Sequence, residues 1–424
     1  MQTVTPREII VAATRAAALE ATRSPWLVTI DAGATLAENA FASMLSALRM
    51  ADAAIVYTDE RSRVAGRAFF VDVLKPGWSP RLLLEGNYFG DLCAVRVDAA
   101  RAAGGYDEGD DPGAVHRLLL RMVERGAAPV HVPVVAIETT SDVVWPPTAN
   151  ELAWQHHEFG GAQPPVAIVI PTRDRVELLR RCVDSVVNTT NYPDFEIVVI
   201  DNGSTDAETL AYLDAIPHRV VRHPGPFNFS DLVNAGAAAS TAPLLVLLNN
   251  DTEMIQADWL TLLVDELAVA DVGAVGCRLV GIDGEAQHEG IALGMGGLPA
   301  MNLDLDHFCR LDEATRDVAA VTAACVLVPR SAFDAVHGFD HELAVGYGDV
   351  DFCLRLRAAG YRVVYTPRVT IRHLGQASRG TSPHPDDDAL FGVRWPIHRA
   401  RANDPYTHPR IEGFVPLWVT EPTR

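Results

Sequence analysis

The sequence predicts an α/β fold in which helices cover both faces of an open, mostly parallel sheet. First, it contains almost continuously apolar runs such as "VAIVIPT" (Val166 to Thr172), which are typical of strands buried on both faces. Second, helical segments alternate with these runs, which favours a doubly wound topology. Third, polar residues follow the runs directly, and open α/β sheets bind ligands at the carboxyl ends of their strands.

The elements after the first buried strand follow in a regular order. The next segment is expected to be a helix, because apolar residues recur in it at helical spacing: Val176, Leu179, Val183 and Val186. "EIVVIDNGSTD" (Glu196 to Asp206) predicts a second buried strand that ends in a turn. A short helix and the strand "HRVVRH" follow, and Ser230 is expected to cap the helix "DLVNAGAAAS".

A third buried strand begins the stretch "LLVLLNNDTE" (Leu244 to Glu253), which turns abruptly from aliphatic to polar. Thr172, Asp201 and Asp251 therefore all fall at predicted strand ends, where this architecture places ligands. "DVAAVTAACVLVP" predicts a further strand, and "DVDFCLRLRAAG" predicts a helix closed by Gly360. "YRVVYTP" and "RVTIRH" predict two more strands.

Composition restricts the classes of function. The chain has 424 residues, of which 48% are hydrophobic, and its charge balance of 35 basic against 55 acidic residues gives −20. Such an acidic protein is disfavoured as a general nucleic-acid or anionic-membrane binder. An anionic ligand would need a local cation, a few arginines or a helix N-terminus. Six dispersed cysteines without a CxxC pair predict buried thiols in a reducing cytoplasm.

The chain is expected to fold as two lobes joined by a linker. Residues 1–140 form the first lobe, 141–164 a linker rich in Pro, His and polar residues, 165–380 the second lobe, and 381–424 a tail that wraps the surface. The first residues contain Arg and Glu throughout, which predicts no signal peptide. No run approaches ~18 apolar residues, so we expect no transmembrane segment.

An internal repeat relates the two lobes. "SPWLVTIDAGATL" parallels "APLLVLLNNDTEM" at an offset of 218, "GGYDE" parallels "HGFDH" at 233, and "GAAPVHVP" parallels "GYRVVYTP" at 234. The order is kept and the offset drifts slowly, which favours duplication over coincidence. The first copy starts in mid-domain, without counterparts of the first two buried strands of the second copy.

Several motifs in the second lobe stand in a fixed order: "VIPTRDR", "VVIDNGSTD", "PFNFSDLVNAGA", "LLNNDTE", "VGAVGCRLV", "QHEG", "GFDHELAVGYGDVDFCLRLRAAGYRVVYTP" and "HLGQASRG". In this order they resemble the family 2 glycosyltransferases, especially bacterial enzymes of cell-surface polysaccharide and cell-wall synthesis such as rhamnosyltransferases. The resemblance covers residues 166–380. It implies a GT-A fold for the second lobe and a truncated, degenerate GT-A-like fold for the first.

The resemblance also implies roles for individual residues. Pro171, Thr172, Arg173, Asp201 and Asn250 match positions that bind the nucleotide. The D-x-D motif, which binds Mg²⁺ or Mn²⁺, matches Asn249, Asn250 and Asp251, with Asn in place of the first Asp. His373 matches a histidine that can join the metal, and Arg379 matches a segment near the diphosphate. Asp349 matches the catalytic base, and Asp351 is the alternative or supporting carboxylate.

These residue types suit sugar transfer from a nucleoside diphosphate. A hard divalent cation takes oxygen ligands and neutralises charge on the leaving group. A carboxylate such as Asp349 can take the proton of an acceptor hydroxyl, which is otherwise a poor nucleophile. Inverting transfer needs a single such base and no covalent intermediate.

A structural interpretation competes with each of these roles. Asp251 could be an ordinary turn residue, and Asp349 or Asp351 could simply stabilise a helix N-terminus. His288 could equally make a structural hydrogen bond. The repeat argues for chemistry, because Asp251 aligns with Gly33, Asp349 with Ala114 and His373 with Thr139. The first lobe thus keeps the apolar pattern without these side chains, so we expect it to be inactive and to bind no metal.

The sequence therefore predicts metal-dependent, inverting transfer of a sugar from a dTDP- or UDP-sugar, with rhamnose as the preferred sugar, to a glycan hydroxyl. The acceptor is expected to be lipid-linked, at the cytoplasmic face of the membrane with peripheral contact. The rival hypothesis is an inactive nucleotide-sugar- or glycan-binding scaffold. Two departures from the family motifs keep it open: Asn249 replaces the first Asp of D-x-D, and Gly348 stands before Asp349, where relatives often have Glu or Asn. A nucleotidyltransferase is disfavoured because no Gly-rich, Lys-containing loop follows the first buried strand.

Overall fold

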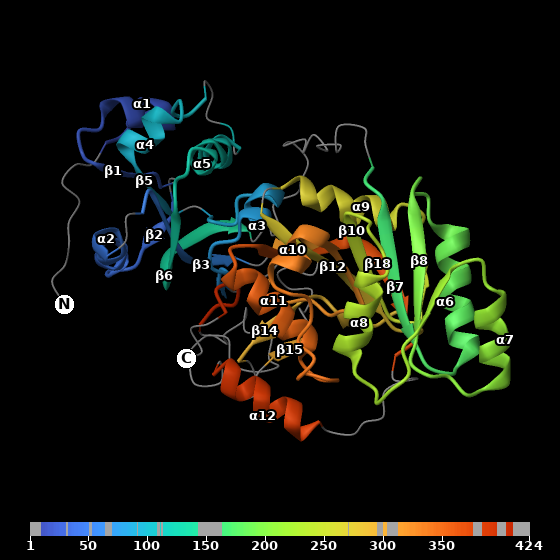
Figure 1. The fold of residues 1–424 in the computed structure, drawn as a ribbon. Helices are drawn as coiled ribbons and strands as arrows, with labels where there is room; N and C mark the ends of the chain where they lie inside the picture. Colours follow the sequence, from blue (N-terminus) through green and yellow to red (C-terminus); the bar gives the residue numbers. More distant parts are fainter. Residues whose placement is uncertain are drawn as a thin grey trace. The chain divides into compact units, whose positions relative to one another are not determined.

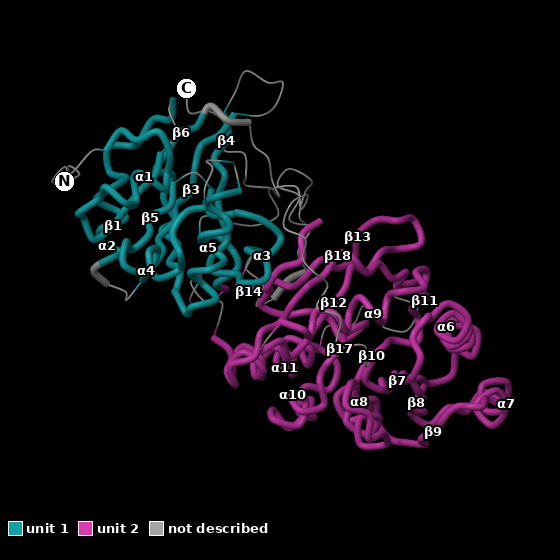
Figure 2. The backbone as a smooth tube through the Cα atoms, turned by 90° about the horizontal axis from the view of Figure 1, so that it is seen from above, with its two compact units in different colours: residues 1–153, 306–311, 405–424 teal, residues 154–305, 312–404 magenta. Residues whose placement is uncertain are grey.

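The computed structural model describes residues 10–30, 33–50, 53–63, 70–90, 92–107, 111, 113–142, 163–269, 271–294, 300–302, 313–375, 384–396 and 404–409. The chain divides into two compact units (Figure 2). Unit 1 comprises residues 1–153, 306–311 and 405–424, and unit 2 comprises residues 154–305 and 312–404. The expected linker lies almost entirely outside the described residues.

Unit 2 is built on a mixed sheet, of which Figure 1 labels β7, β8, β10, β12 and β18. Its main path runs β11-β18-β12-β17-β10-β7-β8-β9. The parallel strands β10, β7, β8 and β9 form one side, and β17 joins them to β12 in antiparallel fashion. The strands are β7 (Val166–Thr172), β8 (Phe195–Asp201), β9 (Arg219–Arg222), β10 (Leu244–Leu248), β11 (Thr252–Met254), β12 (Val272–Val280), β17 (Cys325–Pro329) and β18 (Arg362–His373). Off this path, β13 (Ala286–His288) pairs with β12 and β16 (Arg316–Asp317) pairs with β18.

Each face of this sheet has its own apolar core, because side chains alternate along a strand. In β7, Ala167 and Val169 belong to one core, whereas Val166, Ile168 and Ile170 belong to the other. The first core includes residues of α8 (Phe229–Ala238), α10 (Arg330–Ala335), α11 (Gly348–Ala358) and α12 (Pro385–Arg394). The second includes residues of α6 (Val176–Thr189), α7 (Ala207–Ala215) and α9 (Trp259–Asp265). This confirms the predicted α/β layering.

Three local expectations for unit 2 need correction. Asn228, not Ser230, caps α8, because its side chain accepts the Asp231 N–H at 3.0 Å, whereas Ser230 Oγ donates to the Leu343 carbonyl. The two strands expected after Gly360 are one strand, β18, which pairs in parallel with β12 across a register shift. The strand expected over 317–329 is two short strands, β16 and β17, separated by irregular backbone.

The C-terminal region is not a separate tail. Phe391 of α12 is fully buried in the core of unit 2 and stacks on Tyr347 with ring centroids 4.6 Å apart. Residues 381–404 therefore belong to unit 2, whereas 405–424 belong to unit 1. The boundary expected at residue 140 also lies inside a strand, β6, which runs from Pro129 to Asp142.

Unit 1 is built on a smaller sheet of order β1-β5-β3-β6-β2, with β4 paired to β3. Its buried cluster includes Met44, Val56 and Ile137. The strands are β1 (Trp26–Val28), β2 (Thr35–Leu36), β3 (Ile55–Arg63), β4 (Phe70–Val73), β5 (Cys93–Arg96) and β6 (Pro129–Asp142). The helices are α1 (Arg15–Ala21), α2 (Ala40–Met50), α3 (Pro80–Glu85), α4 (Val97–Ala102) and α5 (Ala114–Glu124).

The six strands of the unit 1 sheet repeat six of the ten strands of the unit 2 sheet. Strands β1-β5-β3-β6-β2 correspond in order to β10-β17-β12-β18-β11. Every pairing keeps its direction: β3–β6 and β12–β18 are parallel, and the other corresponding pairs are antiparallel. Even the side pairing of β4 with β3 matches that of β13 with β12. Among its described residues, unit 1 has no counterpart of β7, β8 and β9.

The strand registers test the alignment of the two copies residue by residue. Leu36 pairs with Ile137 in unit 1, just as Met254 pairs with Ile371 in unit 2. Leu36 is therefore equivalent to Met254, and Gly33 is equivalent to Asp251, as expected. The helices α5 and α11 are both 11 residues long and start at Ala114 and Gly348. Asp349 therefore corresponds to Val115 and not to Ala114, so the expected alignment is wrong by one residue at this position.

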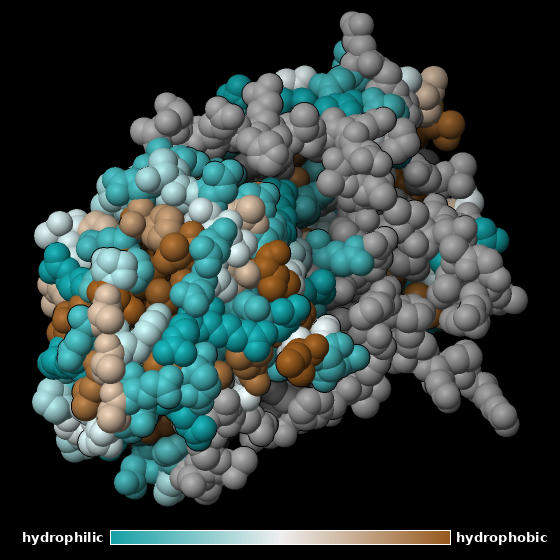
Figure 3. Space-filling model, turned by 90° about the vertical axis from the view of Figure 1, so that its right-hand side faces the viewer, coloured by the Kyte–Doolittle hydropathy of each residue, from teal (hydrophilic) through white to brown (hydrophobic). Residues whose placement is uncertain are grey.

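Hydrophilic residues cover most of the coloured part of the face shown in Figure 3, and hydrophobic residues are scattered among them. Single exposed apolar side chains such as Val187 and Ile255 are ordinary on protein surfaces. Among the described residues, no helix combines the length and the apolar character that crossing a membrane requires.

Candidate active site

The carboxyl ends of β7, β8 and β10 meet at one edge of the sheet of unit 2. Thr172 and Asp201 are paired in the parallel register of β7 and β8. The Asn250 side-chain amide donates to Thr172 Oγ1 at 3.0 Å, and Asn202 N donates to the Thr172 carbonyl at 2.9 Å. The structure therefore brings together three of the expected nucleotide-binding residues, Thr172, Asp201 and Asn250. All three are buried.

Asp201 is held as a carboxylate. Its Oδ1 accepts hydrogen bonds from Ser204 N at 2.9 Å and from Ser204 Oγ, and its Oδ2 pairs with Arg222 at 2.9 Å. Burial alone would raise the pKa of Asp201, but the hydrogen bonds from Ser204 and Arg222 outweigh it and lower the pKa below its usual range. The charge is thus fixed at the strand end.

The loop after β7 has a feature that the motif comparison missed. Asp174 and Arg175 both have left-handed backbones, with φ of 53° and 57°. The Asp174 carboxylate accepts the backbone N–H groups of Thr205 and Asp206 at 2.7 and 2.9 Å. Asp174 therefore joins the two loops that follow β7 and β8. Positive φ at two consecutive non-glycine residues is uncommon and often accompanies a functional loop.

The remaining residues expected near the nucleotide differ in their placement. Pro171 is buried at the end of β7, and Arg173 is exposed immediately after that strand. Arg379, in the segment expected near the diphosphate, lies outside the described residues. The role of Arg379 therefore stays a prediction from the motif alone.

Asp251 and His373 lie in contact. His373 Nε2 is 3.3 Å from Asp251 Oδ1, which confirms the expected approach of these two side chains. The pairing of Thr252 with His373 in β11 and β18 sets this proximity, and Leu374 N donates to the Asp251 carbonyl at 2.8 Å. Residues separated by more than a hundred positions are thus joined through one antiparallel strand pair.

The surroundings of His373 suit a metal ligand. Its Nδ1 lies 2.8 Å from Gln287 Oε1, which can only accept, so Nδ1 donates to Gln287 and Nε2 faces Asp251. Nε2 is buried and has no hydrogen-bond partner among the described residues. A polar atom of this kind, 3.3 Å from a carboxylate oxygen, fits two ligands of one cation.

Asn249 has a defined backbone role. Its N–H donates to the Ala324 carbonyl at 3.0 Å, and its carbonyl accepts from Thr252 Oγ1 at 2.7 Å. One hydrogen bond therefore stabilises the turn between β10 and β11 internally, and the other connects it to the backbone just before β17.

Asp349 and Asp351 have different environments, as their two-residue separation on a helix predicts. Asp349 is half-buried, and its carboxylate accepts Ala323 N at 3.1 Å and Val350 N at 2.9 Å. Asp351 is fully buried. Its oxygens accept from Arg355 at 2.7 Å, Arg394 at 3.1 Å and Trp395 at 2.8 Å. Asp351 therefore has a structural network, which leaves Asp349 as the candidate base.

The segment 322–324 connects the parts of the site. Ala323 N donates to Asp349, the Ala324 carbonyl accepts from Asn249 N, and Thr322 N lies 3.4 Å from His288 Nε2. His288 is buried, and its role stays a prediction. The D-x-D-like turn and the N-terminus of α11 thus meet at one short backbone segment.

Part of this chain matches a known protein family. Residues 167–336 match the family described as glycosyl transferase family 2. The uncharacterized protein y4gI of Sinorhizobium fredii is 32% identical over 422 residues, which cover 88% of this chain and 46% of that protein. The O-antigen biosynthesis protein RfbC of Myxococcus xanthus is 31% identical over 440 residues, covering 92% of this chain and 34% of that protein.

An N-acetylglucosaminyl-diphospho-decaprenol L-rhamnosyltransferase of Mycobacterium tuberculosis is 39% identical over 74 residues, covering 18% of this chain and 24% of that protein. The chain spans less than half the length of the first two relatives. The matched family region contains β7 to α10, with Thr172, Asp201, Asn250 and Asp251, whereas Asp349 and His373 lie beyond it. The mixed sheet with two covered faces and the family match agree on a GT-A fold, and this chain contains a glycosyl transferase family 2 domain.

Proposed function

We propose that unit 2 transfers a sugar from a nucleoside diphosphate to a hydroxyl of a glycan, with inversion, in the synthesis of a cell-surface polysaccharide. The observation that supports this most is the contact of Asp251 with His373 at 3.3 Å. It lies at the end of β10, next to Asn250, which bonds to Thr172 at the end of β7. Candidate metal and nucleotide residues thus converge on one edge of the sheet.

In this proposal the nucleotide occupies the ends of β7 and β8. Pro171, Thr172, Arg173 and Asp201 contact the nucleoside, and Asn250 sits beside them. Because the chain has a charge of −20, a negatively charged diphosphate needs local compensation. Asp251 and His373 would hold Mg²⁺ or Mn²⁺, with Asn249 as a further ligand, and this cation would neutralise the charge of the leaving diphosphate.

Asp349 serves as the general base. Its two observed acceptor contacts come from the backbone N–H groups of Ala323 and Val350. These donors orient the carboxylate. It takes the proton of the acceptor hydroxyl as the hydroxyl oxygen attacks the sugar from the face opposite the leaving group. One base is enough for an inverting transfer.

The proposed donor is a dTDP- or UDP-sugar, with rhamnose as the preferred sugar. The similarity to a rhamnosyltransferase and to an O-antigen biosynthesis protein supports this choice. An acceptor on a lipid diphosphate would place the reaction at the cytoplasmic face of a membrane, with peripheral contact by the protein.

Thermal unfolding with a panel of nucleotide sugars, with and without Mn²⁺, tests donor binding, because a ligand that binds the folded state raises the melting temperature by mass action. We expect one donor to protect the protein, and to do so better with Mn²⁺. Sugar transfer and donor hydrolysis are then measured with that donor. Protection without any turnover would favour the scaffold hypothesis, and no protection by any donor would contradict the proposed site.

A further inference from the structure

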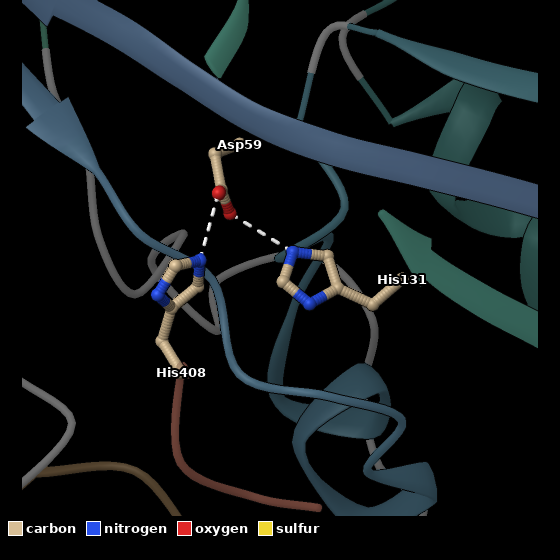
Figure 4. Close-up of side chains that lie close together, drawn as sticks. All are labelled: Asp59, His131 and His408. Carbon is tan, nitrogen blue, oxygen red and sulfur yellow. Dashed lines mark hydrogen bonds and ion pairs between the residues drawn. The ribbon is translucent and has the colours of Figure 1, made fainter. Parts of the chain in front are cut away.

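Unit 1 contains a buried cluster of one carboxylate and two imidazoles that the chemistry of unit 2 does not use. Asp59 lies on β3 and His131 on β6, whereas His408 comes from the far end of the chain and is also part of unit 1. Figure 4 shows both rings directed at the Asp59 carboxylate. Their potential ligand atoms all lie within 4.8 Å of one another.

The contacts within the cluster are short and specific. Asp59 Oδ1 is 2.9 Å from His131 Nε2, and Asp59 Oδ2 is 2.8 Å from His408 Nε2. Asp59 and His408 are fully buried side chains, and that of His131 is 8% exposed. Lys75 N also donates to Asp59 Oδ1 at 3.0 Å, while its Nζ is paired with Glu60 at 2.8 Å. The nearby ammonium charge is therefore already balanced.

The protonation states suit metal ligation, which requires an ionised carboxylate and neutral imidazoles. Burial alone would raise the pKa of Asp59, but the hydrogen bonds from His131 and His408 lower it to about 2. Burial lowers the pKa of His131 below its usual value, against the opposing effect of Asp59. Near neutral pH the carboxylate is thus charged and His131 is neutral.

The fold itself does not require these residues. Val56 in β3 and Val275 in β12 pair with equivalent residues of the strands on either side, so these two valines are equivalent positions. Counting along the strands from them, Asp59 corresponds to Arg278 and His131 corresponds to Tyr365. In unit 2, Arg278 pairs with Glu289 at 2.6 Å, and Tyr365 lies beneath the Arg316 guanidinium. The same strand pairing is therefore compatible with an ordinary ion pair, and the two-histidine, one-carboxylate set is particular to unit 1.

We propose that Asp59, His131 and His408 form a binding site for a divalent first-row transition metal, with Zn²⁺ as the representative ion. Two imidazoles and one carboxylate are common ligands of such ions. Ligands at about 2.0–2.2 Å from a tetrahedral ion are roughly 3.3 Å apart, close to the observed spacing of 2.8 and 2.9 Å. Binding requires each Nε2 to present its lone pair to the metal in place of a hydrogen bond to Asp59, with a small outward shift of the side chains.

This metal would join distant parts of the chain. His408 and Asp59 are 349 residues apart, and a ligand bond between them closes that long loop. Closing a long loop restricts the unfolded chain, so the bound state is stabilised. The site thus has a structural role in unit 1, separate from the cation proposed for unit 2.

The test is performed on the full chain carrying His373→Ala, which removes one proposed ligand of unit 2. After equilibration with Zn²⁺ and exhaustive dialysis, bound metal is measured in this background and after adding Asp59→Asn, His131→Ala or His408→Ala. His116→Ala is the matched control, because His116 is another buried histidine of unit 1, bonded to the Leu83 carbonyl at 2.6 Å. Melting curves are recorded for every variant with Zn²⁺, with Mg²⁺ and with chelator.

We expect the background and the His116→Ala variant to retain about one Zn²⁺ per chain, and the three cluster variants to lose it. The loss of affinity should exceed the roughly 10–100-fold typical of changes outside the first ligand shell. Zn²⁺ should raise the melting temperature of the background above that with Mg²⁺ or chelator. If the folded background retains no Zn²⁺ and gains no thermal protection, the cluster is only a hydrogen-bonded triad and the proposal is wrong. Retention by the cluster variants equal to that of the control would also overturn it.

Discussion

The two units share a strand order, but their clusters of carboxylate and histidine lie at different positions in it. Unit 2 has Asp251 and His373 in contact at the junction of β11 and β18, and the equivalent junction of β2 and β6 in unit 1 has Gly33 and Thr139. Conversely, unit 1 has Asp59 and His131 where unit 2 has Arg278 and Tyr365. The sheet is therefore specified independently of the side chains that provide a site.

The physical reason lies in which residues each property depends on. Strand order and register depend on apolar residues buried on the sheet faces, such as Val56 and Val275, because a slip of one residue would expose them. The polar residues of the two sites, whether after a strand as Asp251 or within a strand as Asp59, do not belong to these apolar cores, so they can change without altering the sheet. Each unit could thus gain or lose a polar site while keeping its core.

The largest expected effect is on the rate of transfer by unit 2. Asp349→Asn keeps the shape of the side chain and removes the base, so we expect transfer to fall by about 10²–10⁴-fold. Donor affinity should stay unchanged, because the proposed metal and nucleoside residues lie elsewhere. Transfer rates and donor binding by thermal shift check both parts. A wild-type rate in this variant would rule out Asp349 as the base.

Asp351→Asn separates the neighbouring carboxylate from catalysis. Asp351 is fully buried and accepts hydrogen bonds from Arg355, Arg394 and Trp395. An amide cannot satisfy all three donors, so we expect a loss of about 1–3 kcal/mol in the free energy of unfolding. The transfer rate of the folded fraction should remain near wild type. Denaturant unfolding and a rate corrected for folded protein measure the two effects, and a folded but inactive variant would move the base to Asp351.

Gln287→Ala tests the orientation of His373. Gln287 Oε1 accepts from His373 Nδ1 at 2.8 Å and keeps Nε2 available to a metal. Loss of such an outer partner typically weakens metal affinity about 10–100-fold. The Mn²⁺ concentration needed for half-maximal thermal protection or activity should rise accordingly, whereas Gln287→Glu, which keeps an acceptor, should restore much of the affinity. Unchanged Mn²⁺ dependence would remove Gln287 from the site.

Unit 1 should respond to acid through Asp59. Its pKa is lowered to about 2 in the folded state from 3.8, so the unfolded state binds protons more readily. This stabilisation is fully present above pH 4 and is lost as the pH falls toward 2, with a size of about 2 kcal/mol. The pKa of His131 is also lowered in the folded state, so its contribution to the free energy of unfolding likewise falls as the pH drops below the usual pKa of histidine. Denaturant unfolding across this pH range should show a flatter profile for Asp59→Asn, and an identical slope in both proteins would contradict this assignment.

The sequence predicted the skeleton of both units better than it predicted their sites. Apolar runs such as Val166 to Thr172 identified the buried strands, and the repeat identified the matching register at Gly33 and Asp251. The contact of Asp251 with His373 followed from family motifs. The cluster of Asp59, His131 and His408 could not be predicted, because its members are far apart in sequence and belong to no metal-binding motif. The repeat predicts no metal ligands in unit 1, but the structure brings together a set with that capacity.

The smallest expected effect concerns Arg117, which corresponds to Asp351 on the matching helix of unit 1. Arg117 pairs with Asp107 at 2.6 Å, but its side chain is 30% exposed and that of Asp107 is 38% exposed. Solvent screens exposed pairs and side-chain ordering opposes them, so such pairs contribute only about 0–1 kcal/mol. Arg117→Gln should therefore change the free energy of unfolding of the full chain by about 1 kcal/mol or less, and less still in high salt. Denaturant unfolding at low and high salt, beside Asp351→Asn, makes the comparison direct. Equal losses for the two variants would show that burial does not distinguish these equivalent helix positions.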